Sequence, residues 1–229
     1  MFPLRLALLL LGIALAPVFL RAADAENIRY LFLVRHGDYD SRDLSNPVAG
    51  PGLNPLGKEQ AAFVASRLAA LPITFDTLVT SQLARARETG DIIAAKLGHT
   101  VLRDANLSET RPPGDGVPPF AVVASAEAQL QRAWNRYVVP APPGAVTHDL
   151  LICHGNVIRW FVVRALGADP RQWSRMEIGN ASITVIEVLP NGSTNLLLYN
   201  DTSHIPVGKQ SWVDRLPDWA APPPAAAAR

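Results

Sequence analysis

Two histidine–glycine pairs are the residues of this sequence whose types and spacing could do chemistry. His36-Gly37 follows the apolar run 28–35, and Arg35 stands directly before the histidine. His154-Gly155 follows a second apolar run at 150–153. A neutral imidazole is a nucleophile, and a neighbouring guanidinium is a fixed positive charge suited to phosphoryl oxygens. The pattern predicts that His36 attacks an anionic, phosphorylated substrate.

The two apolar runs are predicted to bring these pairs to one edge of a sheet. Both runs are rich in β-branched, aromatic or aliphatic residues, which is typical of strands buried on both faces of a parallel sheet. Strand-like and helix-like segments alternate along the chain, which predicts an α/β fold with a mostly parallel sheet. Open sheets of this kind bind ligands at the carboxyl ends of their strands. We therefore expect both pairs to face the same ligand.

The remaining elements are predicted from periodicity and from cap and turn residues. Asn54-Pro55 is a cap followed by a first-turn proline, and Gly98 is a helix stop. Pro190-Asn191-Gly192 indicates a hairpin. The expected strands are 28–35, 76–80, 100–102, 150–153, 182–189 and 194–199. The expected helices run from Asn54 to about Leu71, from Ser81, as cap, to about Leu97, from Ser125 to Val138, from Asn156 to about Leu166, and briefly from Asp169.

Arg85 is predicted to reach the same edge of the sheet. It lies in the first turns of the helix that follows strand 76–80. Helix starts attract anions through free N–H groups and the helix dipole. A guanidinium can also pair with two phosphoryl oxygens at once. Arg87, which has Glu88 and Asp91 nearby, is expected to be a solvated helix charge instead.

Glu109 is the candidate acid. It lies in the long loop 103–119, and loops of this length in compact domains are often functional. An alkoxide leaving group needs a proton in the transition state, which a partly buried glutamic acid can supply. The alternative is an ordinary exposed carboxylate, and the sequence alone leaves both open.

These motifs, in this order and spacing, resemble the histidine phosphatase superfamily, also called phosphoglycerate-mutase-like. The resemblance extends from Ile28 to about Lys209. It rests on Arg35-His36-Gly37, Leu53-x-x-x-Gly57-x-x-Gln60-Ala61, Ser81-x-Leu83-x-Arg85-Ala86, Leu107-x-Glu109 and His154-Gly155. Within the superfamily the chain is most similar to the mitochondrial phosphoglycerate-mutase-family serine/threonine protein phosphatases. That similarity rests on residues 152–159, Arg164-Ala165-Leu166, Ser182-Ile183-Thr184 and Pro190-Asn191-Gly192.

The resemblance implies a three-layer α/β/α fold and a metal-independent phosphomonoester hydrolase that needs no cofactor. His36 would form a phosphohistidine, and Glu109 would protonate the leaving oxygen and then activate water. The implied substrate-binding residues are Arg35, Arg85, His154, Gly155, Asn156 and His204. Phosphoserine or phosphothreonine proteins are the implied substrates, with small sugar or nucleotide phosphate esters as the alternative. The oligomeric state stays open.

Two rival interpretations use the same residues differently. The spacing from Cys153 to Arg159 matches the loop of cysteine phosphatases, in which a thiolate attacks phosphate. The flanking Ile152 and Trp160 do not suit that loop, so Cys153 is expected to pack as a small hydrophobe. The second rival is a non-catalytic phosphate-binding scaffold. It is disfavoured because all the chemical groups of the site are present.

The first 25 residues resemble a secretory signal peptide. Arg5 gives a basic start, Leu6–Leu20 is apolar, and Ala23-Asp24-Ala25 offers small residues for cleavage. The apolar run would span only about 22 Å as a helix, short of a bilayer core of roughly 30 Å. We therefore expect a signal peptide at 1–25, a catalytic domain at 26–209 and a disordered Pro/Ala-rich tail at 210–229. The alternative is an uncleaved N-terminal membrane anchor.

Charge and cysteine content limit the partners and the compartment. The chain has 21 Lys and Arg against 20 Asp and Glu, a net charge of +1. Residues 1–25 contribute Arg5, Arg21 and Asp24, which is +2 and −1, so the remainder is near neutral. It has no basic block typical of nucleic-acid binding. Cys153 is the single cysteine, so no internal disulfide can form. These features predict an exported protein of a bacterial periplasm.

Overall fold

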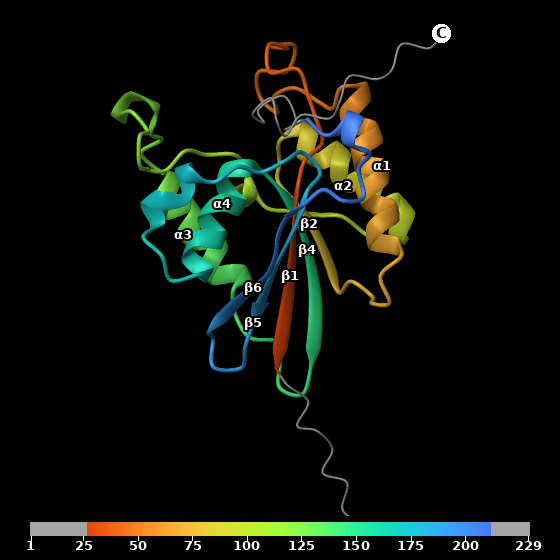
Figure 1. The fold of residues 1–229 in the computed structure, drawn as a ribbon, viewed down its shortest axis with the longest axis vertical. Helices are drawn as coiled ribbons and strands as arrows, with labels where there is room; N and C mark the ends of the chain where they lie inside the picture. Colours follow the sequence, from red (N-terminus) through yellow and green to blue (C-terminus); the bar gives the residue numbers. More distant parts are fainter. Residues whose placement is uncertain (1–26, 212–229) are drawn as a thin grey trace, which may run out of the picture.

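The computed structural model describes residues 27–211, which form a three-layer α/β/α domain around a six-stranded sheet (Figure 1). The strand order is β3-β2-β4-β1-β5-β6. The strands are β1 (Ile28–Arg35), β2 (Thr77–Thr80), β3 (Leu102–Arg103), β4 (Val146–Cys153), β5 (Ile183–Val188) and β6 (Thr194–Asp201). The first four pair in parallel, and β5 and β6 pair antiparallel. The predicted mostly parallel sheet is therefore confirmed.

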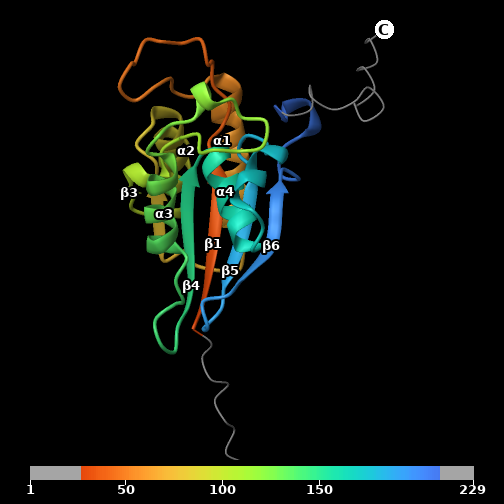
Figure 2. The ribbon, with the colours of Figure 1, turned by 90° about the vertical axis from the view of Figure 1, so that its left-hand side faces the viewer.

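Two pairs of helices cover the two faces of the sheet (Figures 1 and 2). They are α1 (Pro55–Ala69) and α2 (Ala84–Leu97) on one face, and α3 (Ala126–Tyr137) and α4 (Gly155–Ala165) on the other. Each face has its own core, one with Leu68, Ile93 and Ile152, the other with Leu130, Phe161 and Leu151. Alternate residues of the central strands face opposite cores. This double burial explains why their sequences read as unbroken apolar runs.

Tertiary pairing moves several element ends from their expected places. β4 begins at Val146, four residues earlier than predicted, because Val146 pairs with Ile28 at the start of β1. β3 is only Leu102–Arg103, set by its register against Val79 and Thr80. The predicted caps at Asn54 and Gly98 are confirmed. Gly57 N donates to Asn54 Oδ1 at 2.8 Å, and Gly98 adopts φ 66° after α2.

The prediction that Ser81 caps the next helix is wrong. α2 begins at Ala84, and Leu83, whose apolar side chain cannot cap, occupies the N-cap position. Ser81 Oγ instead accepts from Leu83 N at 3.1 Å and lies 2.7 Å from His154 Nε2. A tertiary hydrogen bond to a buried imidazole has replaced the local cap.

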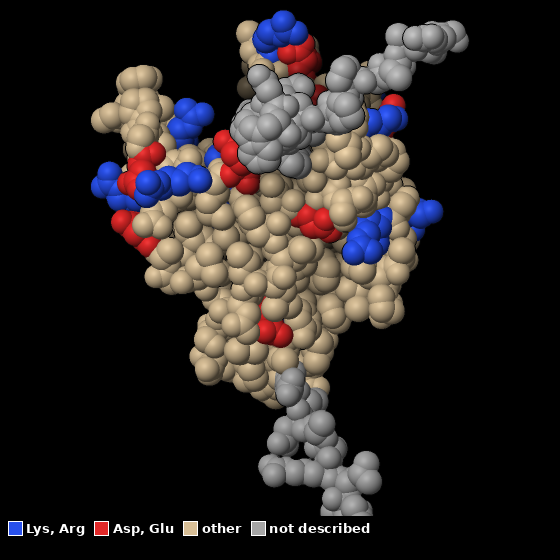
Figure 3. Space-filling view, viewed as in Figure 1, with Lys and Arg blue, Asp and Glu red and all other residues tan. Residues whose placement is uncertain are grey.

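Charged side chains of both signs are scattered over the face shown in Figure 3, and neither sign gathers into one large patch. None of the helices within residues 27–211 is long and apolar enough to cross a membrane. The predicted signal peptide and most of the predicted tail lie outside the described residues. The division into segments 1–25, 26–209 and 210–229 therefore stays a prediction.

The start of α1 packs backbone against backbone beneath the first histidine. A Cβ added to Gly57 would lie 2.0 Å from Asp38 O, and one added to Gly37 would lie 2.3 Å from Gly57 O. Two glycines at this contact let the end of β1 and the helix start approach more closely than side chains permit. The contact holds the segment that carries His36.

Gly57→Ala is expected to destabilise the protein by about 1–3 kcal/mol, because the backbone must shift to admit the methyl group. Gly208→Ala is the matched control, since its added Cβ would have no heavy atom of the described chain within 4 Å other than those of Gly208 itself and its chain neighbours. Urea unfolding of both variants measures the difference. Equal midpoints for the two would contradict this account of the contact.

Candidate active site

His36 lies at the carboxyl end of β1 and is 1% exposed. Its backbone N donates to Cys153 O at 3.1 Å, which joins the ends of β1 and β4. On the ring, Nδ1 lies 2.7 Å from Gly37 O, and Arg85 Nε donates to Nε2 at 3.1 Å. A guanidinium is always a donor, so Nε2 accepts and the ring proton sits on Nδ1. The nucleophilic lone pair of His36 therefore faces the arginine.

The environment of His36 keeps its imidazole neutral. Burial lowers the pKa of His36 well below its usual value, and electrostatic interactions with His154, Arg35 and Arg85 lower it further. The hydrogen bond to Gly37 O opposes this shift but does not reverse it. A neutral imidazole with a fixed tautomer is the reactive form of a histidine nucleophile.

His154 stands beside His36, as expected for two strand ends at one edge. The ring centroids are 4.9 Å apart, and His154 is fully buried. Burial, reinforced by Arg85 and Arg35, holds the pKa of His154 well below its usual value. Its Nε2 pairs with Ser81 Oγ, while Nδ1 is buried with no hydrogen-bond partner among residues 27–211. If Ser81 donates to Nε2, the ring proton of His154 sits on Nδ1, where a phosphoryl oxygen could accept it.

Two arginines add positive charge around the imidazoles. Arg35 NH1 donates to Ile178 O at 2.5 Å, which orients its guanidinium. Gly155 lies against that group, since a Cβ there would be 3.6 Å from Arg35 Nε. Burial lowers the pKa of Arg85, yet a guanidinium stays a cation in proteins. The cluster of His36, His154, Arg35, Arg85 and Glu109 is called the cup below.

Glu109 reaches the cup from the loop between β3 and α3. Burial raises the pKa of the Glu109 carboxyl, although Arg35, the Thr110 N–H, Arg85 and Arg159 pull it back. The Thr110 N donates to Glu109 Oε1 at 3.1 Å. Desolvation thus favours the protonated acid, and the neighbouring cations limit the free-energy cost of forming the carboxylate. The group suits a role that alternates between acid and base.

Asn156 holds the Glu109 loop from the side. Its Nδ2 donates to Thr110 O at 2.7 Å, and its Oδ1 accepts from Arg159. Both polar ends are occupied by protein groups, and the residue is 8% exposed. This arrangement makes Asn156 a positioning residue for the loop rather than an obvious contact for substrate.

The structure does not bring His204 into the cup. Its Nε2 lies 3.0 Å from Ala181 O, and its charged neighbours are Asp201 and Arg67 rather than Arg35 or Arg85. Ile205 N donates to Thr202 O at 2.9 Å, which closes a turn around His204. The expectation that His204 binds substrate therefore stays a prediction.

Sequence reasoning missed three residues that support the cup. Tyr39 lies edge-on to His36, with ring centroids 5.2 Å apart, and Arg85 Cζ stands 4.6 Å over the Tyr39 ring. Thr89 Oγ1 accepts from Gly37 N at 3.1 Å, and Asn180 Nδ2 donates to His36 O at 3.1 Å. An aromatic two residues after Gly37 was the one available signal. Arg87, expected to be solvated, is half-buried.

The thiolate alternative fails on accessibility. Cys153 is fully buried in β4, and burial raises the pKa of its thiol. A thiolate nucleophile needs a lowered pKa and access to substrate. We expect Cys153→Ser and Cys153→Ala to keep at least about a third of wild-type kcat/KM on p-nitrophenyl phosphate, because neither removes a cup residue. Loss of activity in both soluble, folded variants would revive the thiolate route.

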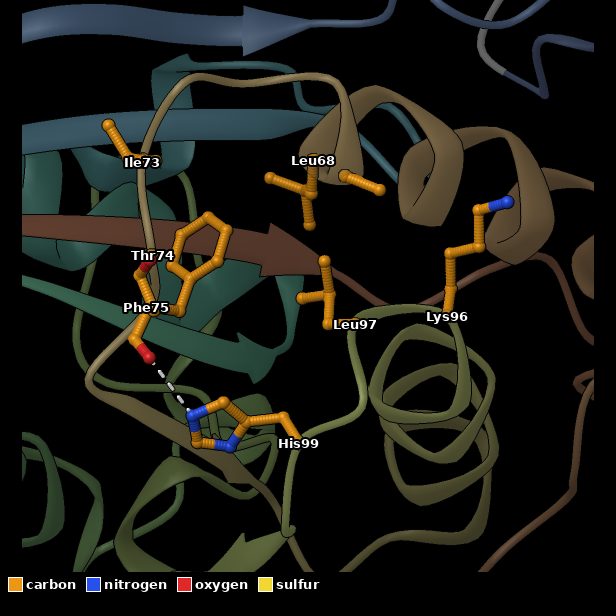
Figure 4. Close-up of a pocket in the computed structure, with 8 residues that line it drawn as sticks. Leu68, Ile73, Thr74, Phe75, Lys96, Leu97 and His99 are labelled. Carbon is orange, nitrogen blue, oxygen red and sulfur yellow. Dashed lines mark hydrogen bonds between the residues drawn. The ribbon is translucent and has the colours of Figure 1, made fainter.

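A cavity of about 270 Å³ lies away from the cup, between the ends of α1 and α2 (Figure 4). It is lined by apolar side chains, among them Leu68, Phe75 and Leu97, and by the polar side chains of Thr74, Lys96 and His99. His99 Nε2 lies 3.0 Å from Phe75 O. None of the five cup residues lines this cavity. Nor do residues 27–211 hold a group of three or more His, Cys, Asp or Glu side chains arranged for a metal ion.

Comparison with known proteins agrees with this geometry. The family profile of the histidine phosphatase superfamily (branch 1) matches residues 31–149 and 131–202. The serine/threonine-protein phosphatase Pgam5, mitochondrial, of Drosophila ananassae is 33% identical over 209 residues, 86% of this chain and 71% of that protein. The human protein of that name is 34% identical over 199 residues, 81% of this chain and 66% of its own length. The chain thus spans about two thirds of these relatives.

Solved structures share the fold. Phosphoglycerate mutase from Plasmodium falciparum superposes with a TM-score of 0.57 at 24% identity, covering 78% of this chain and 94% of that one. The mycobacterial glucosyl-3-phosphoglycerate phosphatase gives a TM-score of 0.60 at 21% identity, covering 76% and 100%. At these sequence identities, the structural similarity is evidence for a shared fold and for nothing more.

The relatives overturn the prediction of a periplasmic protein. The PGAM5 proteins that this chain matches are named as mitochondrial. A short apolar run behind a basic residue is a weak signal, because export signals and other targeting segments share it. The prediction therefore relied on a pattern that does not distinguish one compartment from another.

Three findings now agree: the profile match, relatives above 30% identity that are named phosphatases, and a cup that combines two histidines, two arginines and a glutamate. The match extends across the sheet and both helical layers rather than one motif. The chain belongs to the histidine phosphatase superfamily (branch 1).

Proposed function

We propose that this protein hydrolyses phosphoserine and phosphothreonine in proteins through a phosphohistidine at His36. The observation that carries the proposal is the state of the His36 ring. Nδ1 is held by Gly37 O, so Nε2 presents a lone pair inside a cationic cup. A neutral nucleophile surrounded by positive charge is what attack on a phosphate dianion requires.

In the first step Nε2 of His36 attacks phosphorus and the ester P–O bond breaks. Arg35, Arg85 and His154 bind the non-bridging oxygens and stabilise the charge that they carry in the transition state. Arg85 exchanges its bond to Nε2 for one to a phosphoryl oxygen, which frees the lone pair. Glu109 gives its proton to the departing oxygen, so the product alcohol leaves neutral.

In the second step Glu109, now a carboxylate, takes a proton from water. The hydroxide equivalent attacks phosphorus, the N–P bond breaks, and inorganic phosphate leaves. The electron pair of the N–P bond returns to Nε2, which restores neutral His36. Glu109 keeps the proton that it took from water, so it is again an acid. The raised pKa of Glu109 and the cations beside it suit both halves of this cycle.

Protein substrates are supported by the relatives at 33–34% identity, which are named serine/threonine-protein phosphatases. The test compares kcat/KM of the full-length chain for phosphoserine peptides, phosphothreonine peptides and small phosphate esters. A preference of at least about tenfold for the peptides is expected, since extended substrates add binding energy outside the phosphoryl site. A reversed preference would favour small esters, and no phosphate release from any substrate would favour the scaffold alternative.

Activity is expected to survive EDTA, because guanidinium and imidazole groups supply the positive charge at the phosphoryl group. The measurement is p-nitrophenyl phosphate turnover before and after chelation and gel filtration. A loss that added Mg²⁺ or Zn²⁺ restores would show that a metal takes part.

A further inference from the structure

A polar cavity of about 210 Å³ adjoins the cup. Its lining includes Arg35, Asp38, Tyr39, Ser41, Asn180 and Ser211. Arg35 belongs to the cup itself, and Tyr39 lies edge-on to His36. A different cavity of about 330 Å³, beside Arg87 and Ser108, includes none of the five cup residues in its walls. The group attached to a phosphoryl in the cup can therefore extend past Arg35 and Tyr39 into the first cavity.

The charge of this cavity is set by two residues. Among its lining residues in the described chain, Arg35 is the one cation and Asp38 the one anion. In the proposed reaction Arg35 is committed to the phosphoryl oxygens, and it also donates to Ile178 O. Its charge is thus balanced by the substrate phosphate. The leaving group in this cavity is therefore exposed to the charge of the Asp38 carboxylate and to neutral hydroxyl groups.

Asp38 is held in place by the start of α1. Asn54 Nδ2 donates to Asp38 Oδ2 at 2.7 Å, and Asp38 N donates to Gln60 Oε1 at 2.9 Å. Asn54 N donates to Asp38 O at 3.2 Å, so the backbone is fixed as well. Asp38 is half-buried, and water therefore screens its charge only partly. A fixed, incompletely screened carboxylate acts on whatever occupies the cavity.

We propose that Asp38 selects the leaving group by charge. The cavity accepts neutral or cationic leaving groups and rejects those that carry a carboxylate or a second phosphate. This inference rests on the proposed function and narrows it. A phosphorylated hydroxyl amino acid between neutral or basic residues fits, because its peptide groups are uncharged. Phosphoglycerates and bisphosphates do not fit, because like charges would meet at Asp38.

The test uses three small esters that differ mainly in leaving-group charge: phosphoethanolamine, glycerol 3-phosphate and phosphoglycolate. We expect kcat/KM of the full-length wild type to fall in that order, by roughly tenfold between the cationic and the anionic ester. Asp38→Asn, which keeps the shape and can still accept from Asn54, should reduce this ratio to near one. Asp40→Asn is the matched control, since Asp40 is exposed and pairs with Arg42 on the same loop.

A wild type that prefers phosphoglycolate overturns the inference, as does an unchanged ratio in Asp38→Asn or an equal change in Asp40→Asn. If Asp38→Asn does not fold, the salt dependence of the wild-type kcat/KM ratio provides the test instead. The wild-type ratio should shrink between 20 mM and 500 mM NaCl, and a constant ratio overturns the proposal. Turnover of p-nitrophenyl phosphate distinguishes failure of the Asp38 proposal from failure of the proposed function. With turnover but no charge preference, only the selection by Asp38 fails; without turnover, the proposed function fails too.

Discussion

His36→Ala is expected to lower kcat/KM for every phosphate ester by at least about a thousandfold. The variant keeps the cationic groups of the cup, so it should still bind phosphate, but it has no lone pair to attack phosphorus. The ring of His36 also supplies the acceptor for Arg85 Nε, and its removal frees that guanidinium without replacing the nucleophile. Binding without turnover is the expected phenotype.

The direct measurement for His36 is the trapped intermediate. Rapid acid-free quenching of the wild type with radiolabelled substrate should yield an acid-labile, base-stable phosphoenzyme, and His36→Ala should yield none. His99→Ala serves as the control, because that half-buried histidine lies in the remote cavity of Figure 4. A His36→Ala enzyme with more than a tenth of wild-type turnover would refute the phosphohistidine mechanism.

Glu109→Gln is expected to lower kcat/KM on phosphoserine peptides by about a hundredfold or more. The loss on p-nitrophenyl phosphate should be several-fold smaller. A serine alkoxide cannot leave without a proton, whereas a nitrophenolate is stable enough to leave as an anion. This dependence on the leaving group separates an acid from a residue that only shapes the site. Glu127→Gln, at an exposed position in α3, should behave as wild type on both substrates.

The pH profile follows from the two opposite pKa shifts. The first step needs protonated Glu109, whose pKa is raised, so kcat/KM on phosphopeptides should fall as pH rises through that raised value. It also needs neutral His36, whose pKa is lowered, so kcat/KM should fall only when pH drops through that lowered value. The shifts therefore widen the active range on both sides. In Glu109→Gln, kcat/KM should no longer fall at alkaline pH. If the fall remains in this variant, another group causes it.

Local features of the sequence were enough to locate the ends of the catalytic strands. The apolar runs before His36 and His154 end where a glycine follows, and that pattern depends only on neighbouring residues. Asn54 predicted a helix start and Gly98 a helix end for the same reason. The resemblance to a known family then brought Arg85 and Glu109 into the same site.

Residues whose role depends on partners distant in the chain were harder to interpret. Ser81 looked like a helix cap but bonds His154, which is 73 positions away. His204 looked like a rim residue, yet its contacts turn it toward Ala181. Asn156 proved to hold the backbone of Thr110. Each side chain had a plausible local role, and a distant partner replaced it.

By itself the sequence determined the order of strands and helices, the place of each reactive side chain along them, and the family. Only the tertiary structure decided the chemical state of those side chains. Burial raises the pKa of Glu109 and lowers that of His36, while the Gly37 carbonyl and the Arg85 guanidinium select the tautomer. The reason is physical: desolvation and hydrogen bonding depend on which groups surround an atom in space, and those groups come from segments far apart in the chain.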